Sequence, residues 1–416
     1  MFRQHRKSIV LFISAIFLTV LITTMVIQAT TVIPSTIVIS SGVYPGAPDW
    51  TVWTEGLSYF AKNKYGYLTY SGDNTTDVLP YVLAVGGSIF IKSGDYPIYA
   101  DLNVPVDYTY VKGELNTHII GIATTNYGFF ITGNYTTIEN VWVSNIGTTG
   151  INGFGITFEN VTGGLVTHSK VTATGLDGIH FRRSTNCTAS FNIVDDTGDD
   201  SIATLLGMNN IIISNHIDNH NYPGTNTIRG ITVASENGTI VTGNTVANTP
   251  GSGILVTYMY ADQLCDEVTI SANTVRNAGT ISPGGFAGNG IDVAYARRVT
   301  VTGNVIADAY WNGIHIYYSN FSTVSNNIIS DCGKNATSWQ AGIVLEYYST
   351  SNIITGNNID NPALTQEYGI VETSGGTNNY NVITACIVYG ATVANIITNG
   401  ANSKCNLCYN GTVWVA

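Results

Sequence analysis

Three aspartates have a spacing that suits acid–base chemistry. Asp177 lies in the segment Gly-Leu-Asp-Gly-Ile-His, and Asp199 and Asp200 lie in the later segment Gly-Asp-Asp-Ser-Ile-Ala. Carboxylates held side by side raise one another's pKa because like charges repel, and a carboxyl group that stays protonated near neutral pH can act as a general acid. Whether the three lie side by side depends on the repeat in which they occur.

The two aspartate segments are copies of a repeat with a period near 23 residues. A Gly-Ile pair opens each copy, and Asp200-Ser-Ile fills the one slot that lacks it. Such a period indicates a solenoid of stacked coils, in which equivalent residues become vertical neighbours. We expect Asp177 and Asp199 to occupy the position just before this slot in successive coils. The glycines of the repeat are Gly155, Gly178, Gly230, Gly253, Gly290, Gly313, Gly342 and Gly369.

An asparagine forms the second anchor of each coil. From Gly178 to Gly342 it follows the glycine by 14 or 15 residues, with one interval of 20 after Gly253, whereas the distance on to the next glycine varies. One half of each coil therefore has a fixed length, and the other half carries loops. We expect the asparagines to occupy left-handed corners and to form an internal hydrogen-bonded ladder. They are Asn192, Asn215, Asn244, Asn273, Asn304, Asn327 and Asn357.

Alternating apolar residues predict short strands that pair in parallel with the equivalent strands one coil away, about 4.8 Å apart. The predicted fold is all-β, a single-stranded right-handed parallel β-helix with capped ends. The periodicity resembles the pectin-lyase-like superfamily over roughly residues 78 to 388. That resemblance implies an architecture without one activity, because the superfamily includes lyases, glycosidases, esterases, epimerases, tailspikes and surface proteins.

The two aspartate segments resemble motifs of the polygalacturonase family of glycoside hydrolases. That family uses an Asn-Thr-Asp-Gly motif and, one coil later, a Gly-Asp-Asp motif for an inverting hydrolysis. The resemblance implies Asp200 or Asp199 as general acid and Asp177 as part of the base pair, with carboxyl groups about 6.5–9.5 Å apart. Two other motifs differ, since Arg229 replaces a histidine and Gly253-Ile-Leu-Val offers no cation for a uronate. These differences favour either a neutral glycan as the substrate or a protein without catalysis.

Further side chains are predicted to border the aspartates. His180 and Arg182 lie two and four residues into the strand after Asp177's turn, and Arg229 lies just before a later strand. Because residues at even spacing in a strand share a face, we expect these three to bind substrate beside the acids. Loops at the corner next to this face would wall the groove, at residues 219–229, 276–289 and 332–340.

A column of tyrosines follows the same strand in later coils. Aromatic faces in a row bind sugar rings, so these tyrosines are candidate substrate-binding residues. The alternative is a packing ladder that protects the edge of the sheet. The main members of the column are Tyr258, Tyr295, Tyr317 and Tyr347.

The acids allow two other interpretations. Asp195 and Asp196, together with Asp199 and Asp200, offer hard oxygen ligands within one turn, so calcium is an alternative ligand, although hydrolysis requires no cofactor. Asp-Gly and Asp-Asp pairs also form turns at solenoid corners without any chemistry.

Composition limits the class of partner. Only 10% of the residues are charged and the net charge is −11. This balance argues against nucleic acid, whose phosphates would be repelled, and suits a neutral glycan or a cation. A basic cluster at residues 3–7 precedes an uncharged run from Ser8 to Ile27, which predicts a secretory signal or a membrane anchor and hence an extracellular or cell-surface location.

The predicted organisation has four parts: a signal or anchor at 1–29, a linker with an aromatic-rich segment at 30–75, the β-helix at 76–388 and a C-terminal cap at 389–416. Six cysteines are compatible with export. In the tail, Cys386, Cys405 and Cys408 are close enough in sequence for two of them to pair, or they remain free thiols.

The predicted function is action on an extracellular polysaccharide by an inverting hydrolase in which Asp177, Asp199 and Asp200 are central. The rival hypothesis is a non-catalytic surface or adhesion β-helix that binds envelope glycans or neighbouring proteins. Membrane association depends on whether the N-terminal segment is retained, and nothing in the sequence predicts an oligomeric state.

Overall fold

A computed structural model describes most of the chain from Ala47 onward. The predicted signal or anchor lies outside the described residues. Among the described residues, no helix has the length and apolarity needed to cross a membrane. The described ranges are 47–122, 125–147, 153–219, 228–260, 263–279, 288–334, 340–373, 378–406, 408–409 and 414–415.

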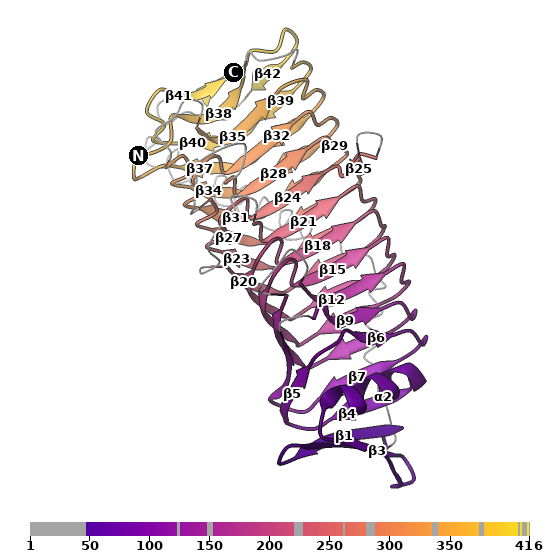
Figure 1. Ribbon diagram of the computed structural model, residues 1–416. Coiled ribbons are helices and arrows are strands. Elements are labelled where there is room, and N and C mark those ends of the chain that lie inside the picture. The colour runs from indigo at the N-terminus through magenta and orange to yellow at the C-terminus, as the bar shows by residue number, and fades with distance from the viewer. Residues whose placement is uncertain are drawn as a thin grey trace, which may run out of the picture. The chain divides into compact units, whose positions relative to one another are not determined.

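The chain winds into stacked coils, and each complete coil contributes one strand to each of three parallel sheets (Figure 1). Along the chain the order within a coil is sheet C, sheet A and sheet B. Sheet C contains β6 (Leu102–Val104), β9 (Tyr127–Ile131), β12 (Phe154–Glu159), β15 (Ile179–Arg182), β18 (Ile202–Leu205), β21 (Ile231–Ala234), β24 (Ile254–Thr257), β28 (Ile291–Ala294), β32 (Ile314–Tyr317), β35 (Ala341–Glu346), β38 (Tyr368–Glu372) and β41 (Ala394–Ile397).

Sheet A is the longest and begins with an antiparallel meander. It contains β1 (Trp50–Glu55), β2 (Ser58–Asn63), β3 (Leu68–Gly72), β4 (Ser88–Ile91), β7 (Tyr110–Gly113), β10 (Thr137–Glu139), β13 (Leu165–Thr167), β16 (Thr188–Ser190), β19 (Ile211–Ile213), β22 (Ile240–Thr242), β26 (Thr269–Ser271), β30 (Thr300–Thr302), β33 (Thr323–Ser325), β36 (Ile353–Thr355), β39 (Val382–Thr384) and β42 (Lys404–Asn406).

Sheet B completes the three-sided stack. It contains β5 (Gly94–Ile98), β8 (Thr117–Gly121), β11 (Trp142–Ile146), β14 (Lys170–Thr174), β17 (Ile193–Thr197), β20 (His216–Asp218), β23 (Thr245–Ala247), β27 (Thr274–Arg276), β31 (Val305–Ala307), β34 (Ile328–Ser330), β37 (Asn358–Asp360), β40 (Ile387–Val388), β43 (Cys408–Tyr409) and β44 (Trp414–Val415). A separate pair, β25 (Cys265–Asp266) and β29 (Ala296–Arg297), extends one corner.

The predicted vertical register is confirmed in sheet C. The isoleucine of each Gly-Ile pair lies opposite the isoleucine of the next coil, from Ile156 in β12 to Ile370 in β38. These side chains fill the apolar interior and are inaccessible to solvent. Glycine precedes isoleucine in each of these pairs because a larger side chain would clash with its neighbours. A Cβ on Gly313 would lie 2.4 Å from Ile329 Cγ2 and 2.6 Å from the carbonyl oxygen of Gly342.

The asparagine ladder is also confirmed, at the corner between sheets A and B. Asn357 Oδ1 accepts hydrogen bonds from the backbone N–H of Asn327 at 3.0 Å and from its Nδ2 at 2.9 Å, and the pattern repeats down to Asn192. The expected left-handed conformation belongs instead to the residue before each asparagine, as at Asn326, where φ is 56°. The sharp bend therefore precedes the ladder residue, which leaves the asparagine side chain free to point inward.

The N-terminal end of the stack is covered by a helix, and the C-terminal end is extended by further strands. At the N-terminal end, η1 (Thr75–Asp77) and α2 (Leu79–Val85) bury Leu79, Val82 and Leu83, and the meander β1–β3 extends sheet A through parallel pairing of β1 with β4. At the C-terminal end, coils continue beyond the predicted limit of residue 388, because β41, β42 and β43 each pair in parallel with the coil before. All six cysteines are free thiols, including those in the tail.

Neighbouring asparagines offer a test of the ladder. Asn357→Ala removes a buried acceptor of two hydrogen bonds, whereas Asn358→Ala removes an exposed side chain from the adjacent position of β37. Because the groups left behind on Asn327 stay buried, we expect Asn357→Ala to lower the free energy of unfolding by about 1–3 kcal/mol. Urea denaturation followed by circular dichroism measures both variants, and equal midpoints would contradict a stabilising ladder.

Candidate active site

The three aspartates lie at the corner where sheet B turns into sheet C. Asp177 stands directly before Gly178 and β15, and Asp200 stands at the equivalent position before Ser201 and β18, so that Gly178 N–H donates to the Asp200 carbonyl at 3.1 Å. Sequence reasoning placed Asp199 in this vertical column. The prediction was off by one residue, because Ser201 occupies the glycine slot and shifts the column to Asp200.

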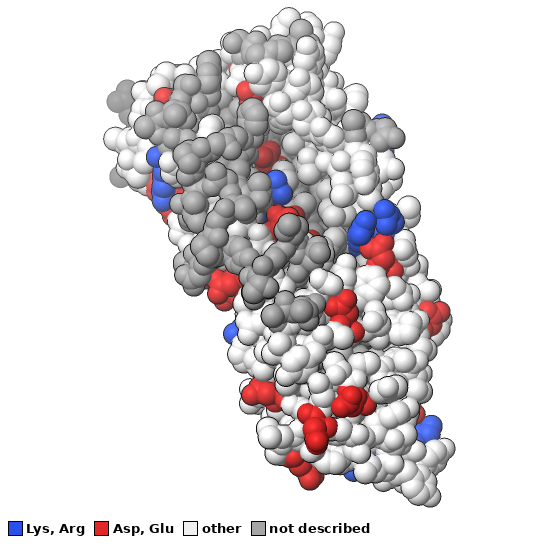
Figure 2. All heavy atoms as spheres, viewed as in Figure 1, with Lys and Arg blue, Asp and Glu red and all other residues white. Residues whose placement is uncertain are grey.

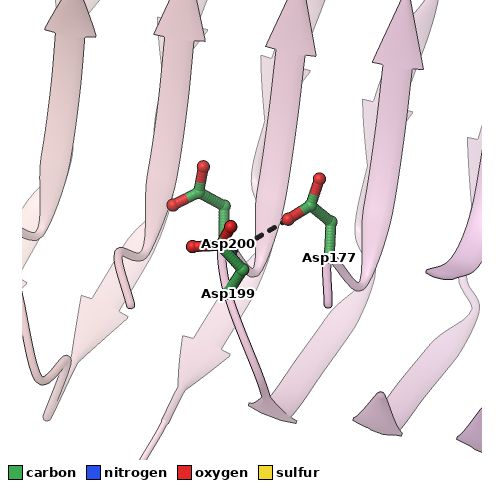
Figure 3. Close-up of side chains that lie close together, drawn as sticks. All are labelled: Asp177, Asp199 and Asp200. Atoms are coloured by element: carbon green, nitrogen blue, oxygen red, sulfur yellow. Dashed lines mark hydrogen bonds between the residues drawn. The ribbon is translucent and has the colours of Figure 1, made fainter. Parts of the chain in front are cut away.

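The three carboxyl groups converge. One oxygen from each of Asp177, Asp199 and Asp200 lies within 4.8 Å of the others. Asp177 Oδ1 accepts a hydrogen bond from the Asp200 backbone N–H at 3.1 Å, and Figure 3 shows the side chains projecting from two adjacent turns into one space. These contacts are closer than the 6.5–9.5 Å typical of an inverting pair, because successive coils bring the two turns together at the spacing of a β-sheet.

Arg229 and His180 border this aspartate cluster. Arg229 Nη1 lies 3.6 Å from Asp200 Oδ1, beyond hydrogen-bond distance but close enough for electrostatic attraction. His180 Nδ1 lies 3.1 Å from Asp177 Oδ2 without hydrogen-bond geometry. Burial lowers the pKa of His180 to about 3, helped by the positive charge of Arg182, so the imidazole is neutral.

Burial is the largest influence on the acids themselves. It raises the pKa of Asp200 to about 7, with Arg229 opposing the rise and Asp199 adding to it. Burial also raises the pKa of Asp177 well above its ordinary value of 3.8, and the charges of Asp200 and Asp199 raise it further. The pKa of Asp199 is raised by burial and lowered in part by Arg229. The cluster therefore retains protons near neutral pH, as an acid catalyst must.

Several buried polar atoms near the cluster have no hydrogen-bond partner among the described residues. They include Asp200 Oδ1, both ring nitrogens of His180, and the hydroxyls of Thr157 and Thr232. Thr157, His180 and Thr232 lie in one outward column of sheet C, as predicted. Because a buried polar group without a partner is costly, such a concentration indicates a surface built to receive polar groups from a ligand or from water.

The acidic residues that could share a calcium ion in the structure are not the full set that the sequence suggested. Asp195 and Asp196 lie on β17 in sheet B, whereas the described acidic residues close enough to share an ion are Asp177, Asp199 and Asp200. Three carboxylates are a suitable oxygen set for a divalent cation. Arg229 already supplies positive charge beside Asp200, so the cluster has a resident counter-ion within the chain.

The other predicted binding residues are more widely distributed. Arg182 faces Glu159, with Arg182 Nε 3.6 Å from Glu159 Oε2. The tyrosines lie at the opposite edge of sheet C, at and just after the ends of the strands. Their rings form a continuous ladder: Tyr258 to Tyr295 at 4.5 Å, Tyr295 to Tyr317 at 5.4 Å and Tyr317 to Tyr347 at 5.5 Å between centroids. Acids and tyrosines thus border the same sheet from opposite edges and in different coils.

One hydrogen-bonded group of charged side chains escaped the sequence-based prediction. Asp292, His315 and Glu346 form a hydrogen-bonded series on sheet C, through contacts of 3.1 Å on each side of the imidazole. Their signal was present, because Asp292 and His315 occupy the same outward column as His180. Glu346 was harder to find, since it lies two residues further along its strand.

Charged side chains are sparse on the face shown in Figure 2, where acidic and basic groups are scattered over a largely neutral surface and a few lie in a recess. Against that background a group of three acids, two of them buried, is exceptional. Its concentration at one corner argues against a purely turn-forming role, because two of the three acids are buried and Asp200 Oδ1 bonds no corner amide.

A family model described as "Right handed beta helix region" matches residues 115–275, 154–319 and 260–408. The chain belongs to the right-handed β-helix family. This agrees with the three-sheet stack and with the predicted relation to the pectin-lyase-like superfamily. No match was found among curated protein sequences.

Solved structures with similar folds perform different tasks. The A-module of mannuronan C-5 epimerase AlgE4 from Azotobacter vinelandii is 16% identical, with a TM-score of 0.65 over 78% of this chain and 92% of the epimerase module. The adhesin PfbA of Streptococcus pneumoniae is 12% identical, with a TM-score of 0.55 over 75% and 84% of the two chains. The catalytic unit of a GH87 α-1,3-glucanase from Streptomyces thermodiastaticus is 15% identical, with a TM-score of 0.51 over 82% and 68%.

The raised pKa of Asp200 predicts an unusual dependence of stability on pH. Its folded pKa is about 7 against an ordinary value of 3.8, so between these values the folded state binds more protons than the unfolded state. The free energy of unfolding should therefore fall as the pH rises from about 4 to about 7. Asp200→Asn removes this penalty, so its Tm should exceed that of the parent at pH 8 by more than at pH 4.

Differential scanning calorimetry at the two pH values tests this expectation. Asp360→Asn is the matched control, because Asp360 is an exposed acid on β37. If the difference in Tm between Asp200→Asn and the parent were the same at pH 4 and pH 8, the assignment of a raised pKa would be wrong.

Proposed function

We propose that this β-helix protein hydrolyses glycosidic bonds in a neutral polysaccharide, with Asp177, Asp199 and Asp200 as its acid–base group. The observation that carries the proposal is the convergence of three carboxyl groups whose oxygens lie within 4.8 Å, two of them buried. A pKa near neutrality for Asp200 supports it. Glycoside hydrolysis needs one carboxylic acid to protonate the leaving oxygen and one carboxylate to assist the attack on the sugar.

The environments of the acids suggest their roles. Asp200 is the proposed general acid, because burial keeps it protonated up to about pH 7. Asp199 is half-buried and more accessible than the other two, which suits a carboxylate that activates water or approaches the sugar. Asp177 accepts a hydrogen bond from the Asp200 backbone N–H, so it helps to position the acid, and burial together with the charges of Asp200 and Asp199 raises its own pKa.

The substrate is proposed to be neutral because the available cations are already engaged. Arg229 faces Asp200, and both Arg182 and Arg183 face Glu159. No further Lys or Arg in the described part of the chain is paired with the aspartate cluster. A uronate polymer would therefore bring negative charges to a site at which the positive charges are already paired with acidic side chains.

The similar folds support action on a polysaccharide without specifying it. One neighbour is named an epimerase of mannuronan and another an α-1,3-glucanase, while a third is a surface adhesin. Export by the segment before residue 30 would place the protein where such polymers are found. A glycan-binding protein without catalysis is the competing outcome, and activity assays separate the two.

Replacement of the acids should abolish cleavage. We expect Asp200→Asn and Asp177→Asn each to lower kcat by about 10²–10⁴, the contribution of a positioned acid or base. The assay is release of reducing ends from a panel of neutral polysaccharides, with Asp360→Asn as the control that should retain full activity. NMR of the first-formed anomer then reports whether the reaction inverts or retains configuration.

Binding without cleavage would overturn this proposal. If the parent protein binds a polysaccharide but releases no reducing ends, or if Asp200→Asn cleaves as fast as the parent, the acid–base role of the cluster is wrong. Thermal melting curves for each variant confirm that any loss of activity occurs in a folded protein.

A further inference from the structure

A second polar group lies on the outward surface of sheet C, several coils from the aspartates. Asp292 in β28 and His315 in β32 are register neighbours, and Asp292 Oδ1 lies 3.1 Å from His315 Nδ1. On the other side, His315 Nε2 lies 3.1 Å from Glu346 Oε2 in β35. The side chains of Asp292 and His315 are almost completely buried.

Glu346 is the accessible end of this series. Its side chain is 22% exposed, and its Oε1 makes no hydrogen bond with any other described residue. Burial disfavours the charged form of His315, but Asp292 and Glu346 outweigh this effect and raise its pKa to about 9, so the imidazole is protonated. Glu346 therefore presents a fixed carboxylate oxygen, with its orientation set by a buried cation behind it.

Aromatic rings flank that oxygen. Tyr317 is the register neighbour of Glu346, and its ring lies 5.5 Å from those of both His315 and Tyr347. A carboxylate acceptor beside partly exposed tyrosine rings matches the chemistry of a sugar, which offers hydroxyl donors on its edges and an apolar C–H surface on its faces.

Packing alone does not account for ions at these positions. The same outward column contains Leu255 in the coil before Asp292, and Val344 and Val371 in the coils after His315. The equivalent positions in adjacent coils thus accommodate apolar residues. Buried ion pairs often contribute no more to folding stability than well-packed apolar residues. A role in binding therefore explains Asp292, His315 and Glu346 better than a role in stability.

We propose that Asp292, His315 and Glu346 form a second sugar-binding site, in which Glu346 accepts hydroxyl hydrogen bonds from a neutral sugar unit that contacts Tyr317 and Tyr347. The series carries two carboxylates and one imidazolium, so it would repel an anionic sugar. This site rests on the proposed function in one respect: the sugar unit belongs to the chain that is cleaved at the aspartates.

Polar side chains connect the two sites. The position before the glycine slot is occupied in successive coils by Asp177, Asp200, Arg229, Ser252, Asn289 and Asn312. Asn289 donates to Asp292 at 3.0 Å and accepts from Asn312, so this row contacts the second site directly. Three to five coils separate Asp200 from the second site, roughly 14–24 Å at about 4.8 Å per coil. The ligand is therefore an extended polysaccharide chain that runs along the axis of the stack.

Binding measurements with oligosaccharides of increasing length test this proposal. The probes are a length series of whichever neutral polysaccharide the parent retains in affinity electrophoresis, and the protein carries Asp200→Asn to prevent cleavage. Affinity should rise once the oligosaccharide is long enough to span both sites. Glu346→Gln should remove that rise, a loss of at least about tenfold for long chains, while short chains bind as before.

Two further variants keep the outcome decisive. Asp360→Asn removes an exposed acid from the same coil on sheet B and should leave every affinity unchanged. Tyr317→Ala removes the aromatic ring proposed to contact the sugar and leaves Asp292, His315 and Glu346 in the chain, in case Glu346→Gln does not fold. The proposal is overturned if Glu346→Gln or Tyr317→Ala retains the length dependence of the parent. Binding that depends on Glu346 in a protein without hydrolase activity would instead support the second site while rejecting the proposed reaction.

Discussion

Parallel pairing without a register shift is the constraint on which this molecule depends. Each coil must place its three strands on those of the coil before, because a slip of one residue would turn the isoleucine column out of the core. The asparagine ladder reinforces this register at one corner, since its buried amides have partners only when equivalent residues are stacked. Glycines at another corner allow the sheets to approach each other closely.

The same constraint determines where chemistry can be located. The corner between sheets A and B is held by the ladder, whereas the corner between sheets B and C accepts extra residues without disturbing the stack. Asp177, Asp199, Asp200 and Arg229 all lie at that tolerant corner, beside outward positions of sheet C that need not be apolar. Stacking then places residues that are one coil apart in sequence close enough for their charges to interact.

Periodic features were predictable, and features that depend on a single coil were less so. The Gly-Ile column, the asparagine ladder and the tyrosine ladder followed from repetition alone. Ser201 in a glycine slot moved the aspartate column by one residue, and β41–β43 form a further coil where the repeat is too degenerate to recognise. The link from His315 to Glu346 involves two different strand positions, so reading single columns could not reveal it. Burial of Asp200, the source of its raised pKa, depends on packing that no motif encodes.

A crystal structure of the Asp200→Asn variant with a bound neutral oligosaccharide tests the central claim most directly, because it shows whether stacked residues act as one surface. The account predicts a sugar chain along sheet C, with a glycosidic oxygen beside residue 200 and a more distant sugar unit against Glu346 and Tyr317. A chain bound on sheet A or sheet B, or one that crosses the stack and contacts neither group, would contradict it.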